Sequence, residues 1–220
     1  MRLQDELDAL RDKCRENTPP HIWRVRQEAI DDLVSSGIAE RAVHAGDQAP
    51  GFRLRDPDGK LISSCDLLGT GSVLIVFYRG GWCPYCNLDL RAVEAVAWQL
   101  RSLGASIVAV SQQSAHESRS TERTNGLSFP SLVDRGGKVA HAFGLRWKLS
   151  RELRATEMES GLDLATVNAE ASWTLTMPAL YVVNPEGIVE YADVSADYTR
   201  RCDPTELIPI LNDIRSCQMH

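Results

Sequence analysis

The sequence has few cysteines, no long apolar run and no excess of positive charge. Six cysteines among 220 residues are far fewer than a disulfide scaffold of this length would carry. The net charge of −6 argues against a nucleic-acid partner. The longest apolar run, residues 73–78, is much too short to cross a bilayer, and the charged N-terminus has no signal-peptide core. We therefore expect a cytoplasmic protein, with reduced cysteines and no membrane partner.

The first 44 residues are expected to form a helical extension that precedes a single domain, 45–220. Apolar residues recur at helical spacing on both sides of a Pro-Pro pair, at Leu3, Leu7, Leu10 and Cys14 and then at Ile22, Val25, Ala29 and Leu33. Gly37 fits the end of the second helix. We expect this hairpin to pack on its own domain, with Cys14 as a small core residue.

The domain has the pattern of an α/β fold. Apolar runs indicate strands, and helical patterns follow the first two of them. Strand, helix, strand, helix in this order implies parallel pairing with right-handed crossovers. The last helix is expected to start at Asp203, with Pro209 bending it or delaying its start. The other expected elements are central strands at 73–78, 105–111 and 179–183, short strands at 52–54, 61–62 and 188–191, and an insertion of helix and loop at 145–170.

The stretch Trp82-Cys83-Pro84-Tyr85-Cys86 follows the first central strand and opens a helix. Unpaired N–H groups and the helix dipole at such a position favour a thiolate, and a second thiol within one turn can close a disulfide on it. Trp82 and Tyr85 are expected to shield the sulfurs. No second cysteine pair accompanies this one and the histidines are scattered, so we expect no metal site. We expect no cofactor either, since the preceding Gly-Gly lacks the lysine and spacing of a phosphate loop.

A strand, a Cys-x-x-Cys pair and a helix form the core of the thioredoxin fold. Met177-Pro178 directly precedes the strand at 179–183, at the place where thioredoxin-like proteins carry a cis-proline that faces the disulfide. A cis bond is an uncommon feature that proteins keep for a purpose. We therefore expect a cis bond before Pro178, which would hold the backbone of Met177 open to pair with an extended substrate.

The chain resembles the peroxiredoxins, the family of alkyl hydroperoxide reductase and thiol-specific antioxidant. Residues 46–54, 129–134 and 139–145 resemble their entry strand and next conserved block, and Arg79-Gly80-Gly81-Trp82-Cys83-Pro84-Tyr85-Cys86 resembles a peroxiredoxin-like subgroup with an Arg-Gly-Gly-Trp-Cys-Pro-x-Cys signature. The resemblance covers about residues 45–215. It implies a thioredoxin fold, with a central mixed sheet flanked by helices, and a peroxide substrate.

Two departures from the family weaken the implied peroxide site. Ordinary peroxiredoxins carry a proline and a threonine before the peroxidatic cysteine, and in that register Arg79 replaces the proline, Cys83 replaces the threonine and Cys86 takes the peroxidatic place. The family also uses an arginine from a later strand, where this chain has Thr176 and Met177. Three arginines could substitute for it: Arg146, Arg200 and Arg201.

The resemblance leaves open which sulfur attacks first. In the peroxiredoxin register Cys86 reacts with peroxide to form a sulfenic acid, and Cys83 condenses with it. In the thioredoxin and glutaredoxin register Cys83, directly after Trp82, is the nucleophile and Cys86 resolves. Both end in the same disulfide, and we favour Cys86 slightly. Some peroxiredoxins resolve through a C-terminal cysteine, a role that Cys217 of a partner subunit could take.

Three functions fit these observations. The first is a thiol-dependent peroxidase that reduces hydrogen peroxide or organic hydroperoxides, with electrons from thioredoxin, glutaredoxin or a small thiol. The second is a dithiol–disulfide oxidoreductase without peroxidase activity. The third is a non-catalytic redox-sensing binding module. A homodimer is compatible with each of them.

Overall fold

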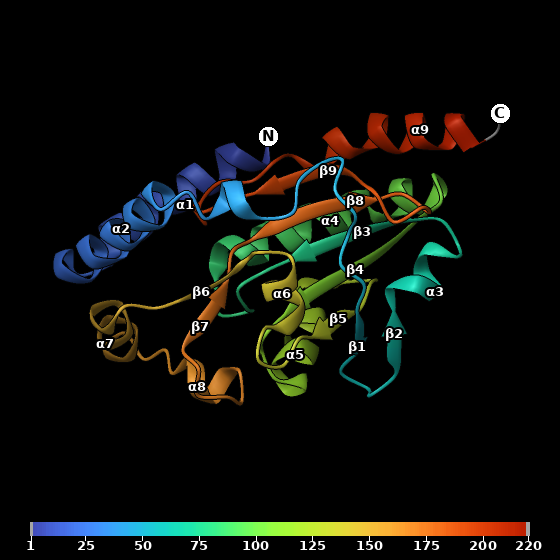
Figure 1. Cartoon of the computed structure of the whole chain (residues 1–220). Coiled ribbons are helices and arrows are strands. Elements are labelled where there is room, and N and C mark those ends of the chain that lie inside the picture. The colour runs from blue at the N-terminus through green and yellow to red at the C-terminus, as the bar shows by residue number, and fades with distance from the viewer. Residues whose placement is uncertain (1, 219–220) are drawn as a thin grey trace.

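A seven-stranded mixed sheet lies at the centre of the computed structural model, which describes residues 2–218 (Figure 1). In spatial order its strands are β2 (Leu61–Ser63), β1 (Arg53–Arg55), β5 (Ser131–Val133), β4 (Ala105–Ser111), β3 (Ser72–Phe77), β8 (Ala179–Val183) and β9 (Val189–Val194). The central strand β3 is buried along its whole length. It pairs in parallel with β4 and antiparallel with β8. The crossovers from β3 to β4 and from β4 to β5 contain α4 (Pro84–Ser102) and α5 (Ala115–Asn125), so the expected parallel pairing is confirmed.

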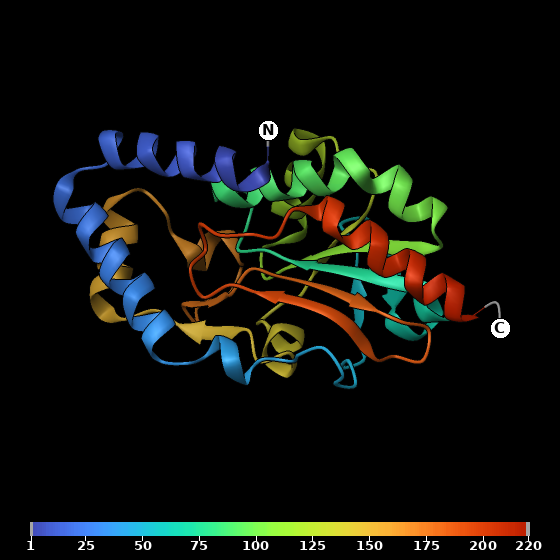
Figure 2. The same ribbon diagram turned by 90° about the horizontal axis from the view of Figure 1, so that it is seen from above.

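Helices cover both faces of the sheet. On one face, α4 packs with α1 (Leu3–Asn17) and α9 (Leu207–Gln218) in a cluster that includes Leu7, Leu90 and Leu211 (Figure 2). On the other face, α6 (Lys138–Ala142) and Phe143 pack with Phe77 of β3. Alternate residues of β3 point into the two clusters, as the two-residue repeat of a strand requires. Within residues 2–218, no helix has both the length and the apolar character of a membrane span.

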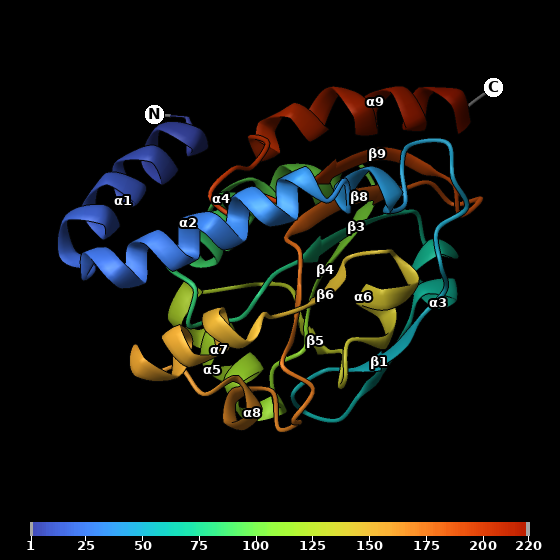
Figure 3. The same cartoon turned by 60° about the vertical axis from the view of Figure 1, so that its left-hand side comes forward.

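The N-terminal hairpin packs on its own domain, as the apolar spacing predicts. Leu3 and Leu7 of α1 are buried in the cluster that contains α4. The second helix, α2 (Pro20–Ser35), is followed by Gly37 in the left-handed region at φ +62°. Figure 3 shows α2 beside α7 (Arg151–Glu159), on the same side of the molecule. A third apolar cluster joins α2 to this region, with Val25, Leu153 and Trp173 among its members.

The segment 145–170 contains more regular structure than the sequence indicates. The expected helices are present as α7 and α8 (Leu164–Val167), but β6 (Arg146–Lys148) also pairs with β7 (Thr174–Thr176) in a separate antiparallel sheet. Both strands are three residues long, too short to show a clear alternation.

Three short elements complete the fold. They are η1 (Ala39–Arg41), α3 (Ser64–Leu68) and η2 (Pro204–Glu206). Asp203 caps η2 through the Thr205 N–H, and α9 begins only at Leu207, so Pro209 falls in its first turn. This is the delayed start that the proline predicts.

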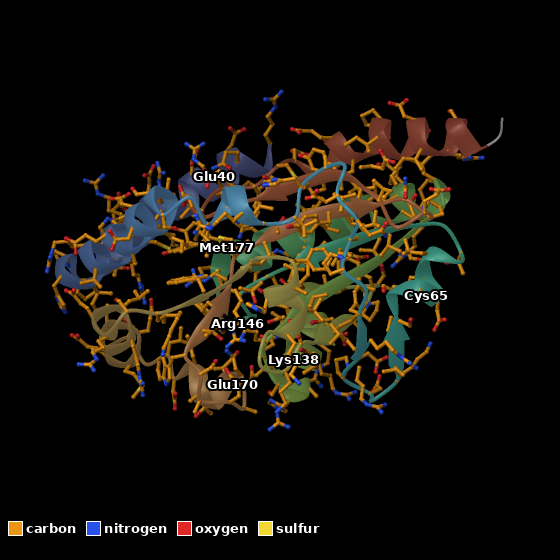
Figure 4. The ribbon with its side chains drawn as sticks, in the orientation of Figure 1. Glu40, Cys65, Lys138, Arg146, Glu170 and Met177 are labelled. Carbon is orange, nitrogen blue, oxygen red and sulfur yellow. The ribbon has the colours of Figure 1, made fainter. Side chains whose placement is uncertain are left out.

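The prediction of a cis bond before Pro178 is wrong, because every peptide bond between residues 2 and 218 is trans. Met177 and Pro178 connect β7 to β8, and backbone groups of both residues are hydrogen-bonded within the chain. The Met177 N–H donates to the Leu145 carbonyl oxygen at 2.8 Å, and the Pro178 carbonyl accepts from the Ser195 N–H at 3.1 Å. The Met177 side chain is fully buried near the middle of the molecule (Figure 4). The Met177 N–H is therefore not free to pair with a substrate.

Candidate active site

The loop between β3 and α4 places both cysteines at the N-terminus of α4. After β3 ends, Tyr78 still donates its N–H to the Val110 carbonyl at 3.1 Å, so the chain leaves the sheet only at Arg79. A turn follows, closed by the Cys83 N–H on the Gly80 carbonyl at 3.0 Å. Cys83 is the N-cap residue of α4, and Pro84 occupies its first position, where a missing N–H costs nothing.

The two glycines of this loop are required by close contacts. A Cβ atom on Gly80 would lie 2.3 Å from the Trp82 indole nitrogen, and one on Gly81 would lie 2.3 Å from the Thr121 hydroxyl. Gly80 also has φ +153°, which L side chains rarely adopt. The Gly81 N–H donates to the Gln113 side-chain oxygen at 2.9 Å. These glycines let the loop pack closely, so the tryptophan and the cysteine are held in fixed positions.

Both cysteines are reduced and buried, and Cys83 lines a cavity that Cys86 does not line. Cys83 is 1% exposed and Cys86 is 0% exposed. The cavity beside Cys83, here called the Cys83 cavity, has a volume of about 350 Å³. Residues of α1, α2 and α7 line it together with the loop: Cys14, Thr18, Trp23, Arg26, Arg79, Trp82, Cys83, Pro84, Tyr85, Glu157, Ser160, Gly161, Leu162 and Tyr198. A small molecule in this cavity meets Cys83 and not Cys86.

The surroundings of Cys83 favour its thiolate. Burial raises the pKa of Cys83, but a hydrogen bond from the Cys86 thiol and the charge of Arg79 outweigh this effect and lower the pKa to about 6. The backbone N–H of Cys86, in the first turn of α4, acts in the same direction. Cys83 is therefore mostly ionised at neutral pH, and the thiolate is the reactive form of a cysteine.

The surroundings of Cys86 favour its thiol. Burial and the neighbouring Cys83 raise the pKa of Cys86 well above its ordinary value. Arg201 is the nearest cation, with its Nη2 3.9 Å from the Cys86 sulfur. Its charge is already matched by Asp89, whose carboxylate accepts from Arg201 Nε at 2.9 Å in a pair that is almost fully buried. Asp89 and Arg201 thus position Cys86 without ionising it.

Arg79 is buried without a carboxylate partner. It is 7% exposed, and its guanidinium carbon lies 4.7 Å from the Trp82 ring centroid and 4.0 Å from that of Tyr198. No atom of residues 2–218 accepts a hydrogen bond from its buried Nε. Cation–π contacts with two rings stabilise the side chain in this position, while the Cys83 thiolate is the leading charge that favours its cationic form.

The structure brings most of the predicted site residues together. Arg79, Trp82, Pro84 and Tyr85 line the Cys83 cavity beside the sulfur. Met177 and Pro178 do not line it, and Met177 belongs to the core cluster on the other face of the sheet. Their predicted role at the disulfide is therefore not supported by this geometry.

The three candidate substitutes for the family arginine lie in different places. Arg146 donates to the Thr174 hydroxyl, and exposed Arg200 pairs with Asp197. Among the three, Arg201 alone contacts a cysteine sulfur within the described residues. The arginine beside Cys83 is nevertheless Arg79, which occupies the position of the family's proline.

Sequence reasoning missed several residues of the site. Glu157 and Arg26 form a bidentate ion pair, at 2.7 and 3.0 Å, between α7 and α2 at the Cys83 cavity. Tyr198 covers Arg79 from the loop after β9. Cys14, expected in the core, is half-buried and lines the cavity. These residues come from segments far apart in the sequence, and no local motif marks them.

Cys65 and Cys202 do not line the Cys83 cavity. Cys65 is exposed on α3 and well separated from Met177 in Figure 4. The side chain of Cys217 is outside the part of the chain that the structure describes. Among the described residues, no cluster of three or more potential ligands could hold a metal ion.

Comparison with known proteins gives relatives of two kinds. The chain is 34% identical over 117 residues to the thiol-disulfide oxidoreductase ResA of Halalkalibacterium halodurans. The aligned residues make up 51% of this chain and 64% of that protein. The chain is 26% identical over 149 residues to the chloroplastic peroxiredoxin Q of Oryza sativa subsp. japonica, which covers 68% of this chain and 58% of that protein. The chain thus spans less than two thirds of the length of these curated relatives.

The fold comparison and the family comparison agree. The structure of peroxidoxin BcpB from Mycobacterium tuberculosis superposes with a TM-score of 0.61 at 20% identity, over 79% of this chain and 97% of that one. This likeness confirms the predicted thioredoxin fold with its flanked mixed sheet. Residues 45–192, more than half of the chain, match the AhpC/TSA family. The chain belongs to the AhpC/TSA family.

Proposed function

We propose that this protein is a thiol-dependent peroxidase that works through a Cys83/Cys86 dithiol–disulfide cycle, with a peroxide as oxidant and a thiol as reductant. The observation that carries the proposal is the ionised Cys83 sulfur at the wall of a cavity, beside the cation of Arg79. Membership of the AhpC/TSA family and the similarity to peroxiredoxin Q support it. A cytoplasmic location, where the pair is held reduced between turnovers, belongs to the same proposal.

The surroundings of the two sulfurs support Cys83 as the attacking residue, instead of the slightly favoured Cys86. The Cys83 thiolate attacks one peroxide oxygen, the O–O bond breaks, and the leaving alkoxide takes a proton from solvent to give an alcohol and a Cys83 sulfenic acid. Arg79 stabilises the negative charge that moves from sulfur to oxygen. The Cys86 thiol then condenses with the sulfenic acid, which forms the disulfide and releases water.

A second candidate function is thiol–disulfide exchange without peroxide reduction. The observation that favours it is the cysteine in place of the family's threonine, since a threonine hydroxyl next to the peroxide is absent from this site. The similarity to ResA points the same way. In this function the same Cys83 thiolate attacks a disulfide sulfur of the substrate, and Cys86 resolves the mixed disulfide.

Stopped-flow mixing of the reduced protein with hydrogen peroxide and with an organic hydroperoxide separates the two candidates. At pH 7 a thiol of pKa about 6 is roughly thirtyfold more ionised than free cysteine, but its lower basicity removes about tenfold of that gain. Ionisation alone thus gives about threefold. We expect loss of the first thiol at a rate at least about a hundredfold above free cysteine, because the cavity also stabilises the transition state.

A rate within about threefold of free cysteine would dismiss the peroxidase, since ionisation then explains all of it. Reduction of insulin disulfides by the same sample would then support the exchange activity. Full peroxidase turnover with the purified protein and a thiol would also remove the need for a non-catalytic sensing role.

A further inference from the structure

The charges that line the Cys83 cavity are matched in pairs, with one exception. Arg26 is neutralised by its bidentate pair with Glu157. Arg79 forms no ion pair with a carboxylate among the described residues. Its leading counter-charge is the Cys83 thiolate, and the Glu157 carboxylate, already paired with Arg26, acts on it more weakly. The cavity is therefore close to electroneutral only while Cys83 is reduced and ionised.

Oxidation removes this balance. In the proposed cycle the thiolate becomes part of a neutral disulfide, while Arg79 keeps its charge because a guanidinium is not deprotonated in proteins. The side chain is 7% exposed, so solvent compensates the charge poorly. The oxidised cavity then contains a buried cation without a counter-ion, directly beside the sulfur that a reductant must attack.

Access to that sulfur is limited to small molecules. Cys83 is 1% exposed, and the cavity that leads to it measures about 350 Å³, in the lower range of cavities that hold small ligands. Its lining joins α1, α2 and α7 to the loop. A cysteine on the surface of a folded protein would have to enter between these helices to reach Cys83.

We infer that the reductant of the oxidised protein is a low-molecular-weight thiol that bears a carboxylate, and that this carboxylate binds Arg79 in the Cys83 cavity. The inference rests on the proposed Cys83/Cys86 cycle and narrows its reductant. Arg79 offers a planar fork of N–H donors, which suits a carboxylate. Trp82 and Tyr198 hold the guanidinium in place, so the fork is positioned before the ligand arrives.

The reduction consists of two thiol–disulfide exchanges. The thiolate of the first reductant attacks the Cys83 sulfur, a mixed disulfide forms at Cys83, and the bond to Cys86 breaks. Cys86 leaves as a thiolate and takes one proton, in keeping with its raised pKa. A second reductant thiolate then attacks the reductant sulfur of the mixed disulfide. This exchange releases the reductant as its own disulfide and regenerates the Cys83 thiolate. Two thiolates and one proton are consumed, and two electrons pass to the protein.

The test uses two reductants of equal size that differ in charge, 3-mercaptopropionate and 3-mercaptopropionamide. The disulfide is formed chemically with diamide, so the test does not depend on activity toward peroxide. Rapid mixing followed by acid quench and alkylation gives the rate of dithiol formation, expressed per thiolate of reductant. We expect the carboxylate reagent to react at least about tenfold faster with the wild-type protein, as for a charge-assisted pair of about 1.4 kcal/mol.

Variants of Arg79 identify the group responsible. Arg79→Gln is expected to bring the ratio of the two rates close to one, whereas Arg79→Lys, which keeps the charge, retains most of the preference. Arg200→Gln is the matched control, since Arg200 is exposed and its substitution changes the net charge by the same amount. The ratio is measured within each variant, so changes in the intrinsic reactivity of the disulfide cancel.

Three results would overturn the inference. The first is a ratio near one in the wild-type protein, and the second is a wild-type ratio that persists in Arg79→Gln. The third is faster reduction by micromolar thioredoxin than by millimolar small thiol, which would assign the reductant to the protein class. If peroxide fails to oxidise the protein but the carboxylate preference is present, the peroxidase proposal fails and this one stands.

Discussion

Two buried arginines lie beside the two sulfurs of one Cys-x-x-Cys pair, and they have opposite consequences. Arg201 neighbours Cys86 and is paired with Asp89, whereas Arg79 neighbours Cys83 and has no carboxylate. A cation whose charge is already matched attracts a thiolate weakly, while an unmatched cation in a buried site attracts it strongly. The comparison teaches that the partner of an arginine, and not its distance alone, decides which thiol ionises.

The same comparison explains why the two cysteines can have distinct roles although both are buried. Desolvation raises the pKa of each sulfur. For Cys83, Arg79 and the Cys86 thiol reverse this effect, and for Cys86 nothing of equal strength does. Since Cys83 alone lines the cavity, charge and access select the same residue.

The largest expected effect comes from replacing each sulfur in turn. Cys83→Ser is expected to abolish oxidation by peroxide, because the remaining Cys86 is fully buried and does not line the cavity. Cys86→Ser is expected to be oxidised once, to a sulfenic acid that persists without a resolving thiol. Mass spectrometry after trapping of the sulfenic acid with dimedone measures both. A dimedone adduct on Cys86 of Cys83→Ser, and none on Cys83 of Cys86→Ser, would reverse our assignment.

A large effect on stability is expected at the other arginine. Arg201→Gln leaves the Asp89 carboxylate buried and unpaired, which costs about 3–5 kcal/mol of unfolding free energy. Chemical denaturation of the reduced protein measures this loss. Arg119→Gln is the control, since its pair with Asp58 is exposed and is worth less than about 1 kcal/mol. Equal losses in the two variants would contradict the view that Arg201 is fully engaged by Asp89.

The sequence was sufficient for the features that follow from local pattern. The length of the apolar runs predicts the central strands, the capping residue Asp203 predicts the start of the last helix, and the Cys-x-x-Cys spacing after a strand predicts the site. Each of these depends on neighbours within about one helical turn. The family resemblance supplied the overall topology.

The sequence was insufficient where tertiary contacts decide. Arg79 packs against the ring of Tyr198, in the loop after β9, and Arg201 pairs with the carboxylate of Asp89 on α4. No rule of sequence spacing relates either arginine to its partner. The trans bond before Pro178 follows from a continuous backbone path between two strands, of which β7 is too short to be predicted. The choice between Cys83 and Cys86 depends on these contacts, so the register arguments alone could not make it.

The smallest expected effect is the pH dependence of stability that Cys83 contributes. The pKa of Cys83 is about 6 in the folded protein and about 8.5 when unfolded, so between these values the unfolded chain binds more protons and stability rises with pH. The contribution is fully present above about pH 8.5, amounts to about 1.4 kcal/mol at pH 7, and is lost as pH falls through 6. The measurement is the unfolding free energy of the reduced protein at pH 5 and pH 8. It is taken as the difference between wild type and Cys83→Ser, so that titrating groups that do not interact with Cys83 cancel.

Arg79→Gln removes the strongest charge behind this contribution and leaves the hydrogen bond from Cys86, the larger cause, in place. We expect the difference between pH 5 and pH 8 to shrink in this variant, and the midpoint of the pH profile for alkylation of Cys83 by iodoacetamide to move from about 6 toward the ordinary thiol value of about 8.5. Arg201→Gln should leave the midpoint nearly where it is, because Arg201 is the weakest of the influences on Cys83. If both arginine variants moved the midpoint equally, the two cations would act on one shared thiolate, and the division of roles between Cys83 and Cys86 would have to rest on access to the cavity alone.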